Sequence, residues 1–287
     1  MDMRDTTRRQ VMTTATLGIA AAATVAAPAV AQDVAGAAAG ASAKGGKQNP
    51  RDKYAKPPYK SQSQPWPGLA SRMDPRPDHG ETSYVGSGRL AGRKAAAIPG
   101  DIRTAGFCLQ LVERAVAAMG GLDLLVCNAA RQQSIPSILD VTDEEFDRTM
   151  KTNIYAPFWI IRAALPHLEP GSAIIGTTSE QAYNPDPDLY VYAQTKAATM
   201  NYVKSLAKQL GPKGIRVNGV APGPIWTPLQ VSGGASQGKL VTFGATTPLG
   251  RAGQPAELAG IFVRLAEDDG SYTTGNIYGA GGGQGQP

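Results

Sequence analysis

Three polar side chains in the second half of the chain are spaced so that they could share one proton-transfer site. Tyr192 follows Ser179 by thirteen residues, and Lys196 comes four residues after the tyrosine. Residues four apart lie on one face of a helix, so Tyr192 and Lys196 are expected to be neighbours. A phenol with an ordinary pKa of about 10 is a weak base at neutral pH, and a nearby positive charge favours its ionised form. The pattern therefore predicts acid–base chemistry, with Lys196 lowering the pKa of Tyr192.

The elements around these residues alternate between short apolar runs and longer helical runs. This alternation predicts an α/β fold with a doubly wound parallel sheet of about five strands and helices on both faces. Ser179 follows an apolar run directly, at the carboxyl end of a strand, where parallel sheets present ligand-binding groups. The predicted strands are Ala95–Pro99, Leu122–Cys127, Ser172–Thr177, Ile215–Ala221 and Asn276–Tyr278, and the predicted helices are Ala105–Met119, Glu144–Leu168, Leu189–Leu210 and Pro255–Ala266.

Four motifs in register resemble the short-chain dehydrogenase/reductase family, over roughly residues 83–287. They are Ser179 with Tyr192-Ala193-Gln194-Thr195-Lys196, the strand end Leu125-Val126-Cys127-Asn128-Ala129-Ala130, the run Lys151-Thr152-Asn153, and the loop Val220-Ala221-Pro222-Gly223. A lone Tyr and Lys at this spacing would usually be a surface pair, but the combination is specific. The resemblance implies a Rossmann-like fold and an NAD(P)-dependent oxidoreductase of alcohols, aldehydes or ketones.

The resemblance also implies a role for each matching residue. Tyr192 would be the general acid/base, Lys196 would also hold the ribose, Ser179 would orient the carbonyl, and Asn153 would support a water-mediated proton relay. Asn128 and Asp101 match positions that line the adenosine side of the cofactor, and Thr227 matches one that touches the nicotinamide carboxamide. Alternatively, Asn128 and Asp101 cap strand ends and Thr227 caps a helix. The implied cofactor-binding residues are Asp101, Asn128, Ala129, Tyr192, Lys196, Pro222, Gly223 and Thr227.

The family pattern breaks before the first of these motifs. The family begins its fold with a strand, a glycine-rich turn and a helix whose backbone N–H groups hold the pyrophosphate. Here Gly86–Gly92 precedes the first predicted strand, so one βαβα block is missing between Lys94 and Ala95. We expect Ala95–Pro99 to take the place of the missing first strand beside Leu122–Cys127, and we expect cofactor binding to be weak. The sequence does not indicate whether NAD or NADP is preferred.

Three interpretations of this gap stay open. The chain is an oxidoreductase with impaired cofactor binding, a catalytically inactive relic that acts as an oligomerisation or assembly partner, or the product of a gene whose recorded sequence lacks the block. The family commonly forms tetramers, so a homo-oligomer, tetramer or dimer, is expected. The partner of the site would be a small-molecule alcohol or carbonyl compound.

The first 82 residues divide into a leader and an arm. Arg8-Arg9, an Ala-rich apolar run and Ala29-Val30-Ala31 predict a twin-arginine signal peptide over residues 1–31, hence a periplasmic or secreted protein. A membrane anchor is the alternative, but the run is short, is weakly hydrophobic and contains Pro28. No stable membrane span is expected after cleavage.

Residues 32–82 form an Ala/Gly-rich and then Pro-rich linker and arm, ahead of the domain at residues 83–287. Trp66, Leu69 and Met73 are the candidate apolar anchors of this arm, with a disordered linker as the alternative. The long Gly/Pro-rich stretch Gly223–Gly250 suggests a lid over the substrate.

Composition excludes several other classes of function. Most of the formal net charge of +5 lies within residues 1–82, so the domain lacks the basic cluster that a nucleic-acid surface needs. Cys108 and Cys127 have the context of core residues, and with two cysteines and two histidines in unrelated places no metal site is expected.

Overall fold

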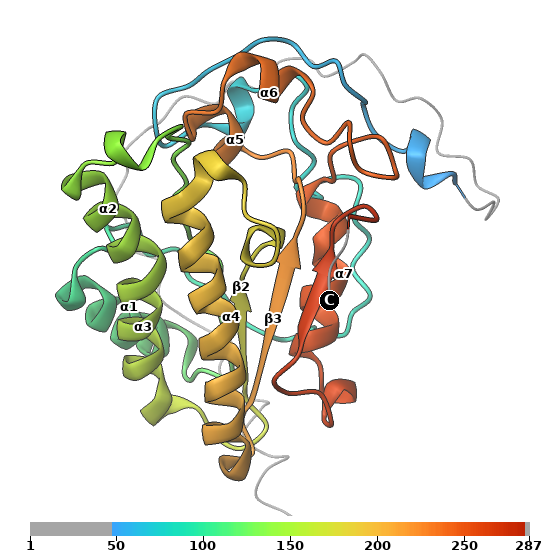
Figure 1. The fold of residues 1–287 in the computed structure, drawn as a ribbon. Coiled ribbons are helices and arrows are strands. Elements are labelled where there is room, and N and C mark those ends of the chain that lie inside the picture. Colours follow the sequence, from blue (N-terminus) through green and yellow to red (C-terminus); the bar gives the residue numbers. More distant parts are fainter. Residues whose placement is uncertain (1–47, 285–287) are drawn as a thin grey trace, which may run out of the picture. The chain divides into compact units, whose positions relative to one another are not determined.

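A parallel sheet runs through the centre of residues 48–284, the part of the chain that the computed structural model describes (Figure 1). Within this part the sheet has four strands in the order β1-β2-β3-β4, and every neighbouring pair is parallel. Their carboxyl ends therefore meet at one edge of the sheet. The strands are β1 (Leu124–Cys127), β2 (Ala173–Thr177), β3 (Arg216–Pro222) and β4 (Ile277–Ala280).

The helices are amphipathic or short, and several of them are capped at the N-terminus by a side-chain hydrogen bond. The side chains of Thr104 and Thr142 accept hydrogen bonds from backbone N–H groups of the first turns of α1 and α2, and a capping box with Glu257 opens α7. The helices are α1 (Ala105–Met119), α2 (Asp143–Met150), α3 (Ala156–Ala164), α4 (Tyr190–Leu210), α5 (Pro228–Ser232), α6 (Gln237–Val241) and α7 (Pro255–Ala266).

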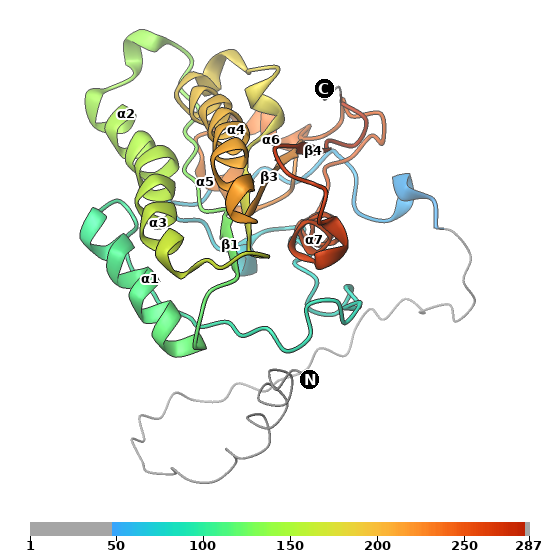
Figure 2. The same cartoon turned by 90° about the horizontal axis from the view of Figure 1, so that it is seen from below.

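Alternate residues of the strands point to opposite faces of the sheet, and each face has its own core. Ile174 and Val217 pack with residues of α1, α3 and α4, whereas Ile175 and Val220 pack with residues of α7. Figure 2, which looks along the sheet from below, shows α1, α3 and α4 on one side and α7 on the other. The predicted doubly wound α/β fold is confirmed.

The predicted strand Ala95–Pro99 is wrong, and with it the count of about five strands. Residues 93–101 have no regular secondary structure, and most of their side chains are exposed. Alanine side chains bury little apolar surface and Pro99 has no N–H to donate, so pairing with β1 would gain little. Leu90 instead joins the core cluster that contains Leu124, so the lead-in segment, rather than a strand, packs on that face.

The long helix predicted over Glu144–Leu168 is interrupted. A π-helical turn at Lys151–Tyr155 separates α2 from α3 and contains Asn153. Such turns are rare and frequent at functional sites. The other predicted helices match, and Ala105–Met119 and Pro255–Ala266 begin and end where predicted.

The Pro-rich arm lies against the stretch between β3 and α7. Tyr59 and Met73 are buried with Trp226 in a core cluster of their own. The N–H of Tyr59 donates to the carbonyl of Val241 at 2.8 Å. Of the candidate anchors, Met73 is 5% exposed, whereas Trp66 and Leu69 are each 47% exposed.

The predicted signal peptide, residues 1–31, and the start of the arm lie outside the described residues. Among residues 48–284, no helix combines the length and the apolar character needed to cross a bilayer.

Candidate active site

A cavity of about 770 Å³ opens at the carboxyl ends of the strands. Ile225, Leu229 and Phe243, from the stretch between β3 and α7, also line it. That this stretch acts as a lid stays a prediction. The predicted site residues among its lining are Asn128, Ala129, Ser179, Tyr192, Lys196, Pro222, Gly223 and Thr227. The structure thus brings together residues that lie up to 99 positions apart in the sequence.

Tyr192 and Lys196 lie on successive turns of α4 and are both nearly buried. The Lys196 Nζ atom is 5.4 Å from the centre of the Tyr192 ring and donates a hydrogen bond to the carbonyl of Thr177 at 2.7 Å. Burial lowers the pKa of Lys196 to about 8.

Burial also has the largest effect on the pKa of Tyr192. It raises the pKa of Tyr192 to about 12, a hydrogen bond with Ser179 acts in the opposite direction, and the charge of Glu180 raises it further. The predicted lowering of this pKa by Lys196 is therefore not found, because desolvation of the phenolate dominates.

Ser179 begins a short 3-10 turn directly after β2. Its Oγ atom accepts a hydrogen bond from the N–H of Gln181 at 3.2 Å, and its side chain faces the cavity beside Tyr192. The preceding residue, Thr178, donates to the carbonyl of Lys196 at 2.7 Å. These bonds hold the end of β2 against α4, which sets Ser179 relative to Tyr192.

Asn153 does not line the cavity; it ties together the elements that do. Its Oδ1 atom accepts from the N–H of Arg131 at 2.8 Å, and its Nδ2 atom donates to the carbonyl of Arg131 at 2.9 Å and to Thr195 Oγ1 at 3.0 Å. Thr195 in turn donates to the carbonyl of Tyr192 at 2.7 Å. The π-helical turn thus connects the loop after β1 to the tyrosine.

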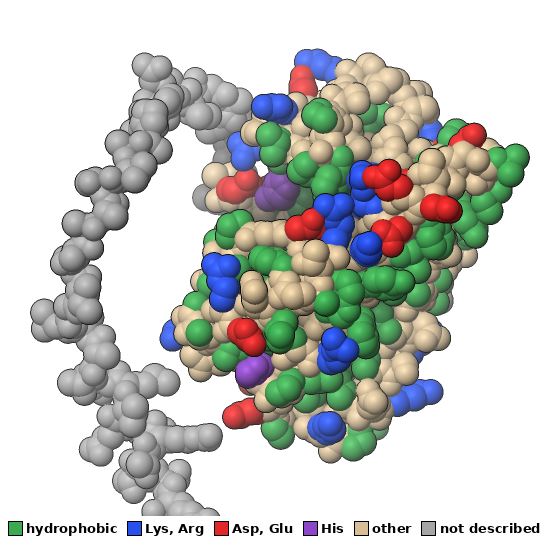
Figure 3. All heavy atoms as spheres, turned by 90° about the vertical axis from the view of Figure 1, so that its left-hand side faces the viewer, with side chains coloured by type: hydrophobic (Ala, Val, Ile, Leu, Met, Phe, Trp, Pro, Cys, Tyr) green, Lys and Arg blue, Asp and Glu red, His purple; other side chains and the backbone are tan. Residues whose placement is uncertain are grey.

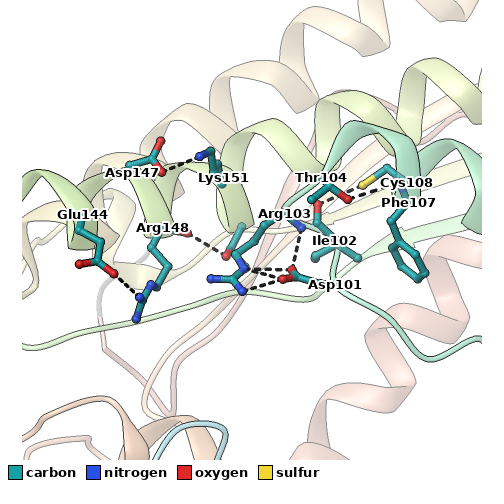
Figure 4. Close-up of polar contacts among 11 residues, drawn as sticks. Asp101, Ile102, Arg103, Thr104, Phe107, Cys108, Glu144, Asp147, Arg148 and Lys151 are labelled. Atoms are coloured by element: carbon teal, nitrogen blue, oxygen red, sulfur yellow. Dashed lines mark hydrogen bonds and ion pairs between the residues drawn. The ribbon is translucent and has the colours of Figure 1, made fainter.

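Asp101 lies in the turn before α1 and is not among the residues that line the cavity. Figure 4 shows its carboxylate bonded to Arg103, whose Nη2 atom lies at 2.6 Å. The arginine lowers the pKa of Asp101 to about 2. Asp101 also accepts from the backbone N–H of Arg103 at 2.9 Å, so it stabilises the turn before α1 and, because residues 95–99 form no strand, caps no strand end.

The cavity contains the residues expected around the nicotinamide, whereas Gly86, Gly88 and Gly92 do not line it. The Asn128–Ala129 loop end, the Pro222–Gly223 loop and Thr227 surround Tyr192 and Lys196. A Cβ placed on Gly86, Gly88 or Gly92 would meet no atom within 4 Å, so these glycines line no close-fitting cradle. Among the described residues, the first α-helix after them begins at Ala105, and Thr104 caps it.

The cavity is also lined by residues that sequence patterns did not predict, Glu180 and His79 among them. Glu180 directly follows Ser179, and this adjacency was the signal that could have identified it. His79 comes from the arm, and nothing in the local pattern places it there. Within residues 48–284, no group of three or more His, Cys, Asp or Glu side chains could hold a metal ion.

Comparison with known proteins finds dehydrogenases and reductases. Residues 86–284 match the family model described as enoyl-(acyl carrier protein) reductase. The uncharacterized oxidoreductase YghA of Escherichia coli is 42% identical, over 83% of this chain and 98% of its own length. Glucose and ribitol dehydrogenase of Daucus carota is 35% identical, over 79% of this chain and 96% of its own.

Solved structures agree on the fold. A dehydrogenase/reductase from Sinorhizobium meliloti has a TM-score of 0.62 and 36% identity, over 68% of this chain and 76% of that one. A blue fluorescent protein from a metagenomic library, in complex with NADPH, also has a TM-score of 0.62, with 35% identity over 68% of this chain and 78% of that one.

The alignment lengths show that this chain lacks residues that its relatives have. The comparison with the Escherichia coli protein runs over 287 positions but includes 83% of the 287 residues of this chain. Some of the aligned positions are therefore filled in the relative and empty here. Such a gap is what the missing βαβα block requires.

Proposed function

Because the chain belongs to the short-chain dehydrogenase/reductase family, we propose that it transfers hydride between NAD or NADP and the carbon of an alcohol, aldehyde or ketone. The observation that carries this proposal is the convergence of Ser179, Tyr192 and Lys196 on one cavity. Their order and spacing match the family's catalytic motif.

The protein side chains would handle the proton and the position of the substrate. In carbonyl reduction the Tyr192 phenol, which its raised pKa keeps protonated, donates a proton to the substrate oxygen, and in alcohol oxidation the proton passes back to the ionised form of Tyr192. The Ser179 hydroxyl, within the same cavity, holds the substrate oxygen. Lys196, anchored on the carbonyl of Thr177, supplies positive charge next to the ring. Bound nicotinamide would supply the hydride acceptor or donor.

Asn153 acts in this proposal as a positioning residue. Its three buried hydrogen bonds fix the loop after β1 against the turn of α4 that carries Tyr192. A proton relay through this region remains a prediction.

We further propose that the dinucleotide is held mainly by its nicotinamide half. Ala129, Pro222, Gly223 and Thr227 would contact that half and Asn128 the adenosine side, and neighbours of similar fold have been solved with NADPH and NADH. A conventional cradle would give each phosphate several charge-assisted hydrogen bonds, about 1.5–3 kcal/mol each. Affinity for the whole dinucleotide should therefore be weak.

Turnover of secondary alcohols by the full chain, followed by the absorbance of reduced nicotinamide with NAD or NADP in excess, tests the reaction. We expect Y192F to lose on the order of 10²- to 10⁴-fold in kcat. The matched control is Y272F, because Tyr272 is fully exposed. Equal rates for Y192F and the unaltered chain would contradict the assignment.

A homo-oligomer is proposed on the strength of exposed apolar side chains. Tyr155 and Phe158 are 44% and 55% exposed beside α3, and Leu109 on α1 is 50% exposed. Figure 3 shows hydrophobic side chains gathered on the side of the molecule that carries α1, α2 and α3. Light scattering should give a dimer or tetramer mass, and a monomer at micromolar concentration would contradict this.

Export is proposed from the leader alone. Arg8-Arg9 and the Ala29-Val30-Ala31 site support a twin-arginine signal and a periplasmic or secreted product. Fractionation should find a protein shortened by 31 residues outside the cytoplasm. Replacement of both arginines by lysine should keep the full-length protein inside.

A further inference from the structure

A carboxyl group without a positive partner stands in the cavity next to the proposed reacting groups. Glu180 follows Ser179 and lines the cavity. Among residues 48–284, no side chain or backbone N–H donates a hydrogen bond to its carboxylate, and no lysine or arginine pairs with it. A Cβ on Gly223 would lie 3.0 Å from Glu180 Oε2, so the carboxylate lies against the Pro222–Gly223 loop.

The charges around Glu180 favour a cation. Asp186, in the loop before α4, lines the same cavity, and Lys239 of α6 lies 3.4 Å from Asp186 but only 2.7 Å from Asp188. Lys196 on α4 points its Nζ atom at the carbonyl of Thr177. Both nearby lysines are therefore engaged elsewhere, Lys239 by Asp186 and Asp188 and Lys196 by the carbonyl of Thr177.

Burial and the charge of Asp186 raise the pKa of Glu180 to about 7. An ionised carboxylate in this place is partly removed from water and has no partner, and such groups are costly unless paired. A ligand that brings a positive charge would remove that cost. A neutral alcohol would leave it in place.

We propose that Glu180 is a specificity residue that binds a substrate ammonium group, so that the cavity selects amino alcohols and amino ketones. The assignment to a substrate rests on the proposed function, whereas binding of the ammonium ion does not. The cavity of about 770 Å³ lies within the usual size range of ligand sites, so there is room for a substituent beside the reacting carbon.

The reaction balances with the groups already named. The carbinol carbon of the amino alcohol gives a hydride to NAD or NADP, and its hydroxyl proton passes to Tyr192. The products are the amino ketone, the reduced nicotinamide and one proton. The ammonium group takes no part beyond its contact with Glu180.

Binding without cofactor tests the contact itself. We would titrate the full chain with 1-amino-2-propanol and with its neutral isostere 2-butanol, by calorimetry, at pH 5.5 and pH 7.5. The aliphatic ammonium ion stays protonated at both values, whereas Glu180 becomes ionised between them. We expect tighter binding of the amino alcohol at pH 7.5 and no change for 2-butanol.

Three variants identify the group that titrates. E180Q should weaken binding of the amino alcohol by on the order of 10- to 100-fold at pH 7.5 and remove the pH dependence. H79Q should keep the pH dependence of binding, which would show that His79, whose side chain also lines the cavity, is not its source. The remote E113Q, at an exposed position on α1, is the matched control. Since Lys196 still titrates in E180Q, a pH dependence that survives there belongs to the lysine and overturns the proposal.

Turnover distinguishes failure of this inference from failure of the proposed function. We expect the ratio of kcat/KM for the amino alcohol to that for 2-butanol to fall at least tenfold in E180Q. Turnover of both alcohols without any preference would overturn the role of Glu180 and leave the oxidoreductase standing. Glu180-dependent binding without turnover of either alcohol would uphold the ammonium site and contradict the proposed function.

Discussion

Removal of the Asn153 side chain is expected to destabilise the fold, although this side chain does not line the cavity. Asn153 is 3% exposed and makes three hydrogen bonds, two with the backbone of Arg131 and one with Thr195. The N153A substitution leaves the N–H and the carbonyl of Arg131 without this partner. Both groups belong to Arg131, which is 6% exposed in the loop after β1.

The magnitude follows from the groups left unpaired. A buried donor or acceptor that loses its partner costs about 1–3 kcal/mol. Thr195 still donates to the carbonyl of Tyr192, so the two backbone groups dominate the effect. We expect N153A to lower the free energy of unfolding by about 2–4 kcal/mol.

Urea unfolding of the full chain measures this loss, provided that the m-value is unchanged. N184A is the matched control, because Asn184 is exposed, and its effect should stay within about 0.5 kcal/mol. A double-mutant cycle with T195V should show coupling. A loss below about 1 kcal/mol in N153A would refute the idea that these bonds hold the loop to α4.

Three further changes probe other parts of the structure. M73A should cost about 2–4 kcal/mol in urea unfolding, because Met73 is 5% exposed in the arm's core cluster; a loss near zero would mean that the arm does not contribute to the fold. R251M should lower the free energy of unfolding by about 3 kcal/mol, because it leaves Glu257, bonded at 2.8 Å, without its buried partner. E257Q should lower the free energy of unfolding by less than R251M does, which urea unfolding of both variants checks. Burial raises the pKa of Glu180 from 4.5 to about 7, so the folded state binds more protons than the unfolded state between these values. The free energy of unfolding should therefore fall as pH rises from about 4.5 to 7, and E180Q should flatten this part of the pH profile.

Local patterns predicted most of the helices and the site residues on them. The spacing of Tyr192 and Lys196 determined that they share a face of α4, since helical geometry is local. The strand before Ser179 placed that residue at the edge of a parallel sheet, where the cavity lies. Thr104 caps the start of α1 and Gly120, in the left-handed conformation, follows its end, and both signals are local.

Contacts between distant parts of the chain explain the features that local sequence patterns did not predict. Ala95–Pro99 is a short apolar run of the length of a strand, but pairing with β1 would have to offset the entropy lost when a segment that buries little surface becomes ordered. The π-helical turn around Asn153 depends on hydrogen bonds to Arg131 and Thr195, which come from distant parts of the chain. The high pKa of Tyr192 depends on burial by the surrounding elements, which sequence spacing does not report.

Binding of reduced nicotinamides to the full chain tests the central claim, that the cavity grips the nicotinamide half and has lost the diphosphate cradle. We would follow nicotinamide fluorescence with NADH, with NADPH and with the reduced mononucleotide, for the unaltered chain, for K196M and for the exposed control K208M. The account predicts that mononucleotide and dinucleotides bind within about tenfold of one another, in the millimolar range, and that K196M alone weakens all three. Micromolar binding of a dinucleotide with far weaker binding of the mononucleotide, or no binding of any of them, would contradict it.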